Sequence, residues 1–303
     1  MPADLHDNIY STNNGNYYLS SPFARAKYSL NGCTTMQVYG YTNLDTYNQL
    51  GVSKDGVMSV LDCGGAGHNT WDVDVTGARN VEVIASAEGK LITTVSGTFI
   101  NAIRFIGGVA TKIPPTAPAS RVLIYGDSIA NGWVTTSPVS QAWTMLLRAH
   151  IPVIVDGWGG RTMKENTSTE ELRTALASLF ATASPSIVWI SIGYNDYKNS
   201  SWSAADFGTA YADLLDKINA ALPSATIYAQ TPIIASNEAA NGLGDTLGAY
   251  RTVIGTAQST RTAFCNLVDG SAILESGDLY DGIHPSTAGH AKYAAAVKTV
   301  LGL

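Results

Sequence analysis

The stretch from Arg121 to Asn131 constrains the fold of this chain more than any other part of the sequence. Four apolar or aromatic residues, 122–125, form a short run typical of a strand buried on both faces. Gly126 ends the run, and Asp127 and Ser128 follow where a parallel strand would turn into its helix. Ligands and reactive groups gather at that end of an open α/β sheet, so the sequence predicts a strand followed by a functional turn. The alternative is a polar turn that only caps the next helix.

The second half of the chain alternates apolar strand candidates with helical patterns. The strand candidates are 121–125, 152–156, 186–192, 225–230 and 263–268, and the helical patterns are 141–149, 170–183, 204–222, 246–258 and 287–301. The pattern at 204–222 has apolar residues at helical spacing, and Ser203 with Asp206 forms a start that resembles a capping box. Such alternation predicts a parallel sheet with helices on both faces. Residues 121–303 are therefore predicted to form a three-layer α/β/α domain.

The first 112 residues have short alternating segments and no long helical period. Strand-like segments lie at 36–41, 57–62, 71–75, 81–85, 91–95 and 101–106, separated by turns that contain glycine. This spacing predicts an antiparallel, jelly-roll-like β-sandwich at 1–112, as a carbohydrate-binding or accessory domain. Residues 113–120 are rich in proline and predict an extended linker between the two domains.

The composition excludes several kinds of partner. Only 14% of the 303 residues are charged, against about 25% in typical proteins, and the net charge is −6. Such a chain lacks the basic face that nucleic acids and anionic membranes require. No apolar run approaches the roughly 18 residues of a membrane-spanning helix. The low charge favours an extracellular or secreted protein, although the first ten residues form no signal peptide and a cytoplasmic location stays open.

The three cysteines decide little about the compartment. Cys33 and Cys63 lie in the N-terminal third and could form a disulfide under oxidising conditions. Cys265 falls in a predicted strand, where a free cysteine behaves as a small apolar residue. No spacing of cysteine and histidine indicates zinc, and no metal or cofactor is predicted. His290, in the last helical pattern, is expected to be exposed to solvent.

Polar residues follow three of the predicted strands and precede the last helix. Ser128 follows the first strand, Gly160 the second and Asn195 the third, and the pair Asp281 and His284 precedes the last helix. Because the carboxyl ends of parallel strands lie on one edge of a sheet, these residues are expected to converge.

Each of these residue types suits one role in acyl transfer to a serine. His284 can take the hydroxyl proton of Ser128, because imidazole titrates near neutral pH. Asp281 can hold the imidazole in one tautomer. The backbone N–H groups of Ser128 and Gly160, with the side-chain amide of Asn195, can donate to the oxyanion of a tetrahedral intermediate.

Four segments of the chain resemble, in order, the four conserved blocks of the SGNH (GDSL) hydrolase superfamily. They are Gly126-Asp127-Ser128, the turn at Gly160, Gly193-Tyr194-Asn195-Asp196 and Asp281-Gly282-Ile283-His284. The resemblance covers about 121–303 and implies a flavodoxin-like sheet, a Ser-His-Asp triad, an oxyanion hole and no metal. Asp156 departs from the pattern, because many members have an asparagine there. The domain order also resembles two-domain carbohydrate esterases.

The predicted substrate is a small-molecule or polysaccharide ester, with acetyl as the acyl group and a carbohydrate as its carrier. The loop 232–244 has no long apolar stretch to line a fatty-acyl channel, and no segment forms an amphipathic lid. Asp127, Trp133, Trp158 and Tyr194 are expected to contact the substrate, with core packing as the alternative for the two tryptophans.

Other functions stay open at the same site. They are acyl transfer to an alcohol, lipase or aryl esterase activity, and carbohydrate binding without catalysis. Two further folds are excluded, because no Gly-x-Ser-x-Gly elbow surrounds Ser128 and Thr162 replaces the third glycine of a dinucleotide-binding loop.

Overall fold

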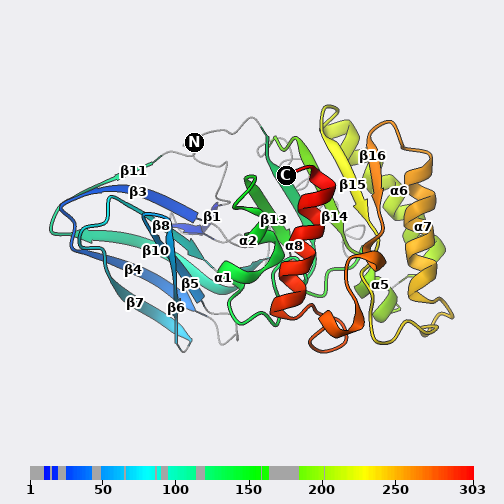
Figure 1. Cartoon of the computed structure of the whole chain (residues 1–303), viewed down its shortest axis with the longest axis horizontal. Helices are drawn as coiled ribbons and strands as arrows, with labels where there is room; N and C mark the ends of the chain where they lie inside the picture. The colour runs from blue at the N-terminus through cyan, green and yellow to red at the C-terminus, as the bar shows by residue number, and fades with distance from the viewer. Residues whose placement is uncertain are drawn as a thin grey trace. The chain divides into compact units, whose positions relative to one another are not determined.

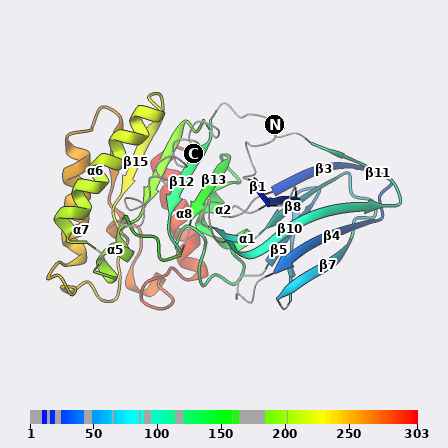
Figure 2. The same cartoon turned by 180° about the vertical axis from the view of Figure 1, so that it is seen from behind.

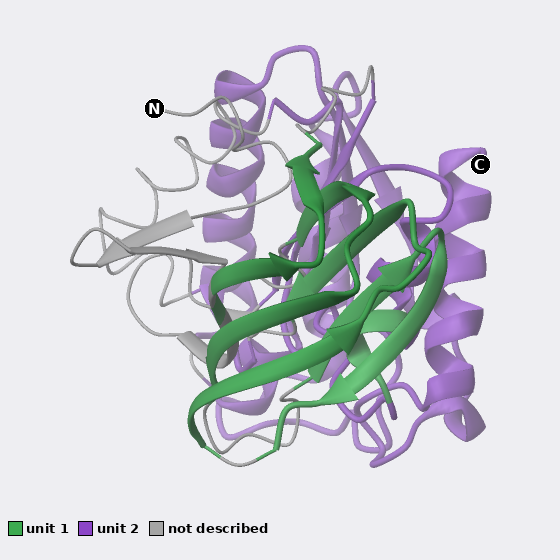
Figure 3. Ribbon diagram, turned by 90° about the vertical axis from the view of Figure 1, so that its left-hand side faces the viewer, with its two compact units in different colours: residues 1–117, 137–140 green, residues 118–136, 141–303 purple. Residues whose placement is uncertain are grey.

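The computed structural model describes residues 10–13, 16–19, 25–42, 49–64, 66–85, 87–89, 95–113, 120–157, 159–163, 184–200 and 202–303. The chain divides into two compact units, which Figure 3 colours separately. Unit 1 comprises residues 1–117 and 137–140, and unit 2 comprises residues 118–136 and 141–303. The sequence did not predict that residues 137–140 group with unit 1. Most of the predicted linker lies outside the described residues.

Unit 1 contains two antiparallel sheets, with strand orders β1-β2-β10-β4-β7, where β9 also pairs with β10, and β11-β3-β8-β5-β6. The strands are β1 (Tyr10–Asn13), β2 (Asn16–Leu19), β3 (Arg25–Asn31), β4 (Thr35–Thr42), β5 (Gln49–Lys54), β6 (Val57–Asp62), β7 (Gly67–Asp74), β8 (Asn80–Ala85), β9 (Ala87–Gly89), β10 (Val95–Ile106) and β11 (Val109–Lys112). Five predicted strands are confirmed as β4, β6, β7, β8 and β10. The sixth, at 91–95, lies almost entirely outside the described residues.

Residues of both sheets contribute to one apolar core in unit 1. Along β4 buried and half-buried residues alternate, so that Met36 and Val38 point into the core, where Leu50 of β5 also lies. Two antiparallel sheets that share an apolar core are what the predicted sandwich requires. Cys33 and Cys63 both belong to this core, and no disulfide joins them.

Unit 2 is built on a parallel sheet with the strand order β13-β12-β14-β15-β16. Its strands are β12 (Val122–Gly126), β13 (Val153–Gly157), β14 (Ile187–Ser191), β15 (Thr226–Gln230) and β16 (Cys265–Val268). Every residue of β12 is buried, as expected of a strand covered on both faces. The order is that of the flavodoxin-like fold, so the predicted fold class is confirmed.

Helices cover both faces of this sheet (Figures 1 and 2). The helices of unit 2 are α2 (Trp143–Leu147), α5 (Tyr194–Lys198), α6 (Ala204–Ala221), α7 (Leu247–Ser259) and α8 (Thr287–Leu301), with short 3-10 turns η1 (Gly270–Ala272) and η2 (Ser276–Asp278). The short helix α1 (Pro138–Gln141) lies mostly in the segment that groups with unit 1. Helix α2 packs against α8, and α6 against α7. The predicted helix at 170–183 lies outside the described residues, and the one at 141–149 is shorter, as α2.

Side-chain caps fix where the long helices begin. Ser203 Oγ accepts from Asp206 N at 3.1 Å before α6, as predicted. Thr246 and Ser286 do the same before α7 and α8, with N–H···O distances of 3.2 and 3.1 Å. Each such cap contributes about 1 kcal/mol. None of the helices in the described part of the chain is long and apolar enough to cross a membrane.

Candidate active site

The candidate residues gather at the carboxyl edge of the unit 2 sheet. Strand β12 ends at Gly126 and leads directly into Ser128, and the loop after β13 contains Gly160. Asn195 lies in the first turn of α5, which follows β14. The turn Asp281–His284 comes just before α8. Hydrogen bonds, given below, connect the first and last of these segments, which lie far apart in the sequence.

Ser128, His284 and Asp281 form a hydrogen-bonded chain. Ser128 Oγ lies 2.9 Å from His284 Nε2, and His284 Nδ1 lies 2.8 Å from Asp281 Oδ2. When the Nδ1 proton is donated to the carboxylate, Nε2 is free to accept the hydroxyl proton of Ser128. This geometry is the one that activates a serine as a nucleophile.

The backbone of its own turn holds the Asp281 carboxylate. His284 N and Ile283 N donate to Asp281 Oδ1 at 2.8 and 3.0 Å. Burial acts to raise the pKa of Asp281, but the hydrogen bonds from His284 outweigh burial and lower this pKa below its ordinary value. The carboxylate is therefore ionised at neutral pH. Gly282 has φ +83°, and a Cβ there would lie 2.3 Å from Ser236 Oγ, so both conformation and space require glycine.

Gly160 and Asn195 follow the two strands that pair with β12: Gly160 lies in the loop after β13, and Asn195 lies in the first turn of α5, after β14. Gly160 is exposed, with φ +72°, so its conformation and not crowding favours glycine. Asn195 Nδ2 donates to Asp127 Oδ2 at 3.3 Å. An amide nitrogen carries two hydrogens, so Asn195 keeps a second N–H for another acceptor.

Asp127 is buried, with 3% of its surface exposed, which corrects the prediction that it contacts substrate. Its Oδ1 accepts from Ile129 N at 2.9 Å, and its Oδ2 accepts from Asn195. Burial raises the pKa of Asp127 to about 6, against the opposing effects of the Ile129 hydrogen bond and then of His284. Asp127 and Ser128 lie in the turn that follows β12, where Ser128 is half-buried and Asp127 is buried. Asp127 thus orients Asn195.

The model of the GDSL-like lipase/acylhydrolase family matches residues 124–292, which is more than half of the chain. The chain belongs to this family. The resemblance to SGNH hydrolases in the sequence is thereby confirmed, and the chain is an ester hydrolase by class. All candidate residues described above fall within the matched range.

Solved structures similar to this acylhydrolase share its fold along nearly the whole chain. A family two carbohydrate esterase from Clostridium thermocellum, in complex with cellohexaose, has a TM-score of 0.70 at 16% identity and covers 98% of this chain and 99% of its own. An acetyl xylan esterase from Butyrivibrio proteoclasticus has a TM-score of 0.66 at 11% identity and covers 97% of this chain and 95% of its own. A salicylyl-acyltransferase from a tetracycline biosynthetic pathway has a TM-score of 0.71 at 17% identity and covers 92% of this chain and 82% of its own. A sequence comparison with curated proteins found no match.

Two aromatic side chains of this acylhydrolase belong to the candidate site: Trp133 lies beside His284, and Tyr194 precedes Asn195 at the start of α5. The Trp133 ring is half-buried, with its centroid 6.2 Å from that of His284. Tyr194, at the start of α5, is half-buried too, and burial raises its pKa to about 12, helped by Tyr197 and then Asp281. The phenol is therefore neutral. Both side chains remain candidates for substrate contact, and Trp158 lies outside the described residues.

His290 is fully buried, which corrects the expectation that it is exposed to solvent. It shares the buried face of α8 with Tyr293 and Val297 at helical spacing, a periodicity that could have indicated this from the sequence. His290 Nδ1 accepts from Trp143 N at 3.3 Å, and burial lowers the pKa of His290 to about 4, so its imidazole is neutral. Across the described ranges, no three His, Cys, Asp or Glu side chains cluster as metal ligands would.

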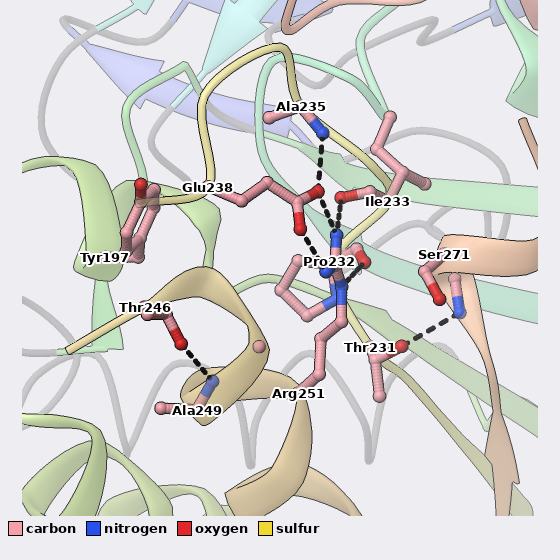
Figure 4. A network of polar contacts seen from close by, with 12 residues as sticks. Tyr197, Thr231, Pro232, Ile233, Ala235, Glu238, Thr246, Ala249, Arg251 and Ser271 are labelled. Atoms are coloured by element: carbon pink, nitrogen blue, oxygen red, sulfur yellow. Dashed lines mark hydrogen bonds and ion pairs between the residues drawn. The ribbon is translucent and has the colours of Figure 1, made fainter. Parts of the chain in front are cut away.

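Sequence reasoning missed the contacts that hold the loop after β15. Arg251 on α7 donates to both carboxylate oxygens of Glu238 at 2.7 Å each, and to two backbone carbonyls of this loop (Figure 4). In the same loop, Ser236 N donates to Gly282 O at 2.7 Å. The fixed loop therefore supports the turn that carries Asp281 and His284. No local sequence pattern predicts that Arg251 on α7 pairs with Glu238 in this loop.

Asp127→Asn is expected to stabilise the fold. Because folding raises the pKa of Asp127 from 3.8 to about 6, the native state binds the extra proton, and wild-type stability falls as pH rises between these values. Asparagine removes that cost, which is about 3 kcal/mol where both states are ionised. Urea unfolding from about pH 4 to about pH 8 should show an advantage of the variant that grows until about pH 6 and then stays constant.

The same Asp127→Asn variant is expected to be a poorer enzyme. Its amide would place an N–H against Asn195 Nδ2, so Asn195 must turn and its free donor is lost. We expect kcat to fall by about 10–10² with KM little changed. Asp269→Asn is the control, because this exposed residue caps η1 and asparagine caps equally well. A stabilised variant with full activity would show that Asp127 does not orient Asn195.

Proposed function

We propose that this chain is a serine esterase that removes short acyl groups, acetyl above all, from a carbohydrate. The observation that carries the proposal is the unbroken hydrogen-bonded chain from Ser128 through His284 to Asp281, at 2.9 and 2.8 Å. Gly160, in the loop after β13, and Asn195, in the first turn of α5, supply donors suited to an oxyanion.

The proposed reaction proceeds in two halves. Ser128 Oγ attacks the ester carbonyl while His284 Nε2 takes its proton, and the negative charge on the carbonyl oxygen is met by the N–H groups of Ser128 and Gly160 and by Asn195. The intermediate collapses to an acyl-serine as His284 returns the proton to the departing alcohol. Water, deprotonated by His284, then attacks the acyl-serine and releases the acid and the free hydroxyl of Ser128.

The substrate class is supported by the surroundings of the site. The loop 232–244 lacks a long apolar stretch that could line a fatty-acyl channel. Arg251 and Glu238 hold the first half of this loop in place. Trp133, beside His284, and Tyr194, which precedes Asn195 in α5, offer aromatic faces on which a sugar ring can pack. Similar folds include proteins described as carbohydrate esterases and as an acetyl xylan esterase.

Acyl transfer to an alcohol is the second candidate. The likeness to a salicylyl-acyltransferase favours it, and transfer uses the same residues as hydrolysis. The two reactions differ only in whether water or an alcohol attacks the acyl-serine, because His284 can deprotonate either. A purely carbohydrate-binding role fits less well, because binding alone needs no serine hydrogen-bonded to a histidine and an aspartate.

A panel of p-nitrophenyl esters from acetate to palmitate, run beside acetylated oligosaccharides, tests the proposal. We expect turnover to be fastest with acetate and acetic acid to be released from at least one sugar. Addition of a simple alcohol should divert part of the acyl group to a new ester if transfer competes. Fastest turnover with octanoate or longer, and no acetate released from any sugar, would contradict the carbohydrate assignment and favour a lipase.

A further inference from the structure

Arg161, the residue after Gly160, turns its side chain back beneath the strand ends that carry the active site. Arg161 Nη1 donates to Gly126 O at 2.9 Å and to Asp156 O at 2.6 Å, and Nη2 donates to Asp156 Oδ1 at 2.7 Å. Its guanidinium also lies 4.3 Å from the centre of the Tyr125 ring. One side chain therefore joins the end of β12, the end of β13 and the loop that follows β13.

The Asp156–Arg161 pair is removed from water, since neither side chain is exposed. Burial acts to lower the pKa of Arg161, but Asp156 and then Tyr125 outweigh burial and raise it, so the guanidinium is charged. A buried guanidinium is costly unless a carboxylate neutralises it and acceptors satisfy its N–H groups. Replacing a buried pair with apolar residues is often neutral or stabilising, so stability alone is weak grounds for such a pair.

We propose that Asp156 and Arg161 are a positioning pair that sets the two backbone donors of the oxyanion hole, the N–H groups of Ser128 and Gly160. Arg161 is bonded to Gly126, two residues before Ser128, and follows Gly160 directly in the chain. The planar guanidinium donates to Gly126 O, Asp156 O and Asp156 Oδ1 at fixed mutual angles, which a lysine ammonium cannot do. The inference rests on the proposed function and names residues outside its triad and donors.

The pair also accounts for the departure of residue 156 from the pattern of many SGNH hydrolases. An asparagine there can accept one hydrogen bond from Arg161, but it brings no charge to neutralise the guanidinium. In this chain the aspartate and the arginine therefore depend on each other. Loss of either should disturb the oxyanion donors while Ser128, His284 and Asp281 stay chemically intact.

The test compares Arg161→Lys and Asp156→Asn with the wild type, using a soluble acetate ester and its thionoester, in which sulfur replaces the carbonyl oxygen. Sulfur accepts hydrogen bonds poorly, so the ratio of oxoester to thionoester rates reports on the oxyanion donors. Rates are expressed per serine titrated with an organophosphate, so that misfolded protein does not count. Arg261→Lys is the matched control, because Arg261 also pairs with an aspartate, Asp216, but just before β16 begins, at the opposite edge of the sheet.

We expect kcat for the oxoester to fall by about 10–10² in both variants, with KM within about threefold of wild type and a lower oxoester-to-thionoester ratio. Arg261→Lys should keep the wild-type ratio. If Arg161→Lys does not fold, the ratio of the isosteric Asp156→Asn variant decides alone. A wild-type ratio in the titrated variants would overturn the positioning role, whereas a wild-type enzyme with no titratable serine would overturn the proposed function itself.

Discussion

Ester turnover is expected to fall by about 10⁴ or more when Ser128 is replaced by alanine, and by a similar factor in His284→Ala. In the proposed mechanism Ser128 provides the attacking oxygen, and His284 Nε2, which lies 2.9 Å from it, is the base that takes the proton. Both side chains are half-buried at the edge of the sheet, so alanine leaves the core of unit 2 intact. Initial rates on p-nitrophenyl acetate, with circular dichroism to check the fold, measure the effect.

The double variant separates a catalytic unit from two independent contributions. When two residues act as one unit, loss of either removes their whole shared contribution. The double variant should therefore be no slower than the slower single variant. Ser259→Ala, at the exposed end of α7, is the control for replacing a serine and should keep full activity. A double variant clearly slower than either single variant would mean that Ser128 and His284 do not act as one unit.

The sequence predicted the sheet of unit 2 well because of where its strands lie. Strands covered on both faces are continuous apolar runs, so β12 and β14 were recognisable within two residues of their ends. Unit 1 was harder. Strand β3 exposes polar residues between buried ones, and β5 contains a glycine and a serine, so neither shows the apolar alternation of β4.

In the candidate site, too, the sequence predicted some features and not others. Ser128, His284 and Asp281 were predicted to converge because parallel strands end on one edge, and the structure brings them together. The burial of Asp127 could not be predicted, because Asp127 lies in the turn beyond β12, where side chains no longer alternate between the two faces of the sheet. The contacts of Arg161 could not be predicted from the sequence either. A long side chain can reach either face of a loop, and the sequence does not say which.

Asn195→Ala is expected to lower kcat by about 10²–10³ with a smaller change in KM. Asn195 Nδ2 already donates one hydrogen to Asp127 at 3.3 Å, and its second N–H gains most when the carbonyl oxygen becomes an anion. The loss should therefore appear in the transition state and not in substrate binding. Steady-state kinetics on acetate esters measure the split, and Asn266→Ala, at an exposed position of β16, is the control.

Asn195→Asp sharpens this prediction, because aspartate keeps the shape of asparagine and removes both donors. Its carboxylate would face Asp127 on one side and the developing oxyanion on the other, so repulsion adds to the lost hydrogen bond. We therefore expect this isosteric variant to be at least as slow as Asn195→Ala, and to recover part of its activity as pH falls and a carboxyl proton restores a donor. If Asn195→Asp were as fast as wild type, or if either variant changed KM alone, Asn195 would bind substrate without holding the oxyanion.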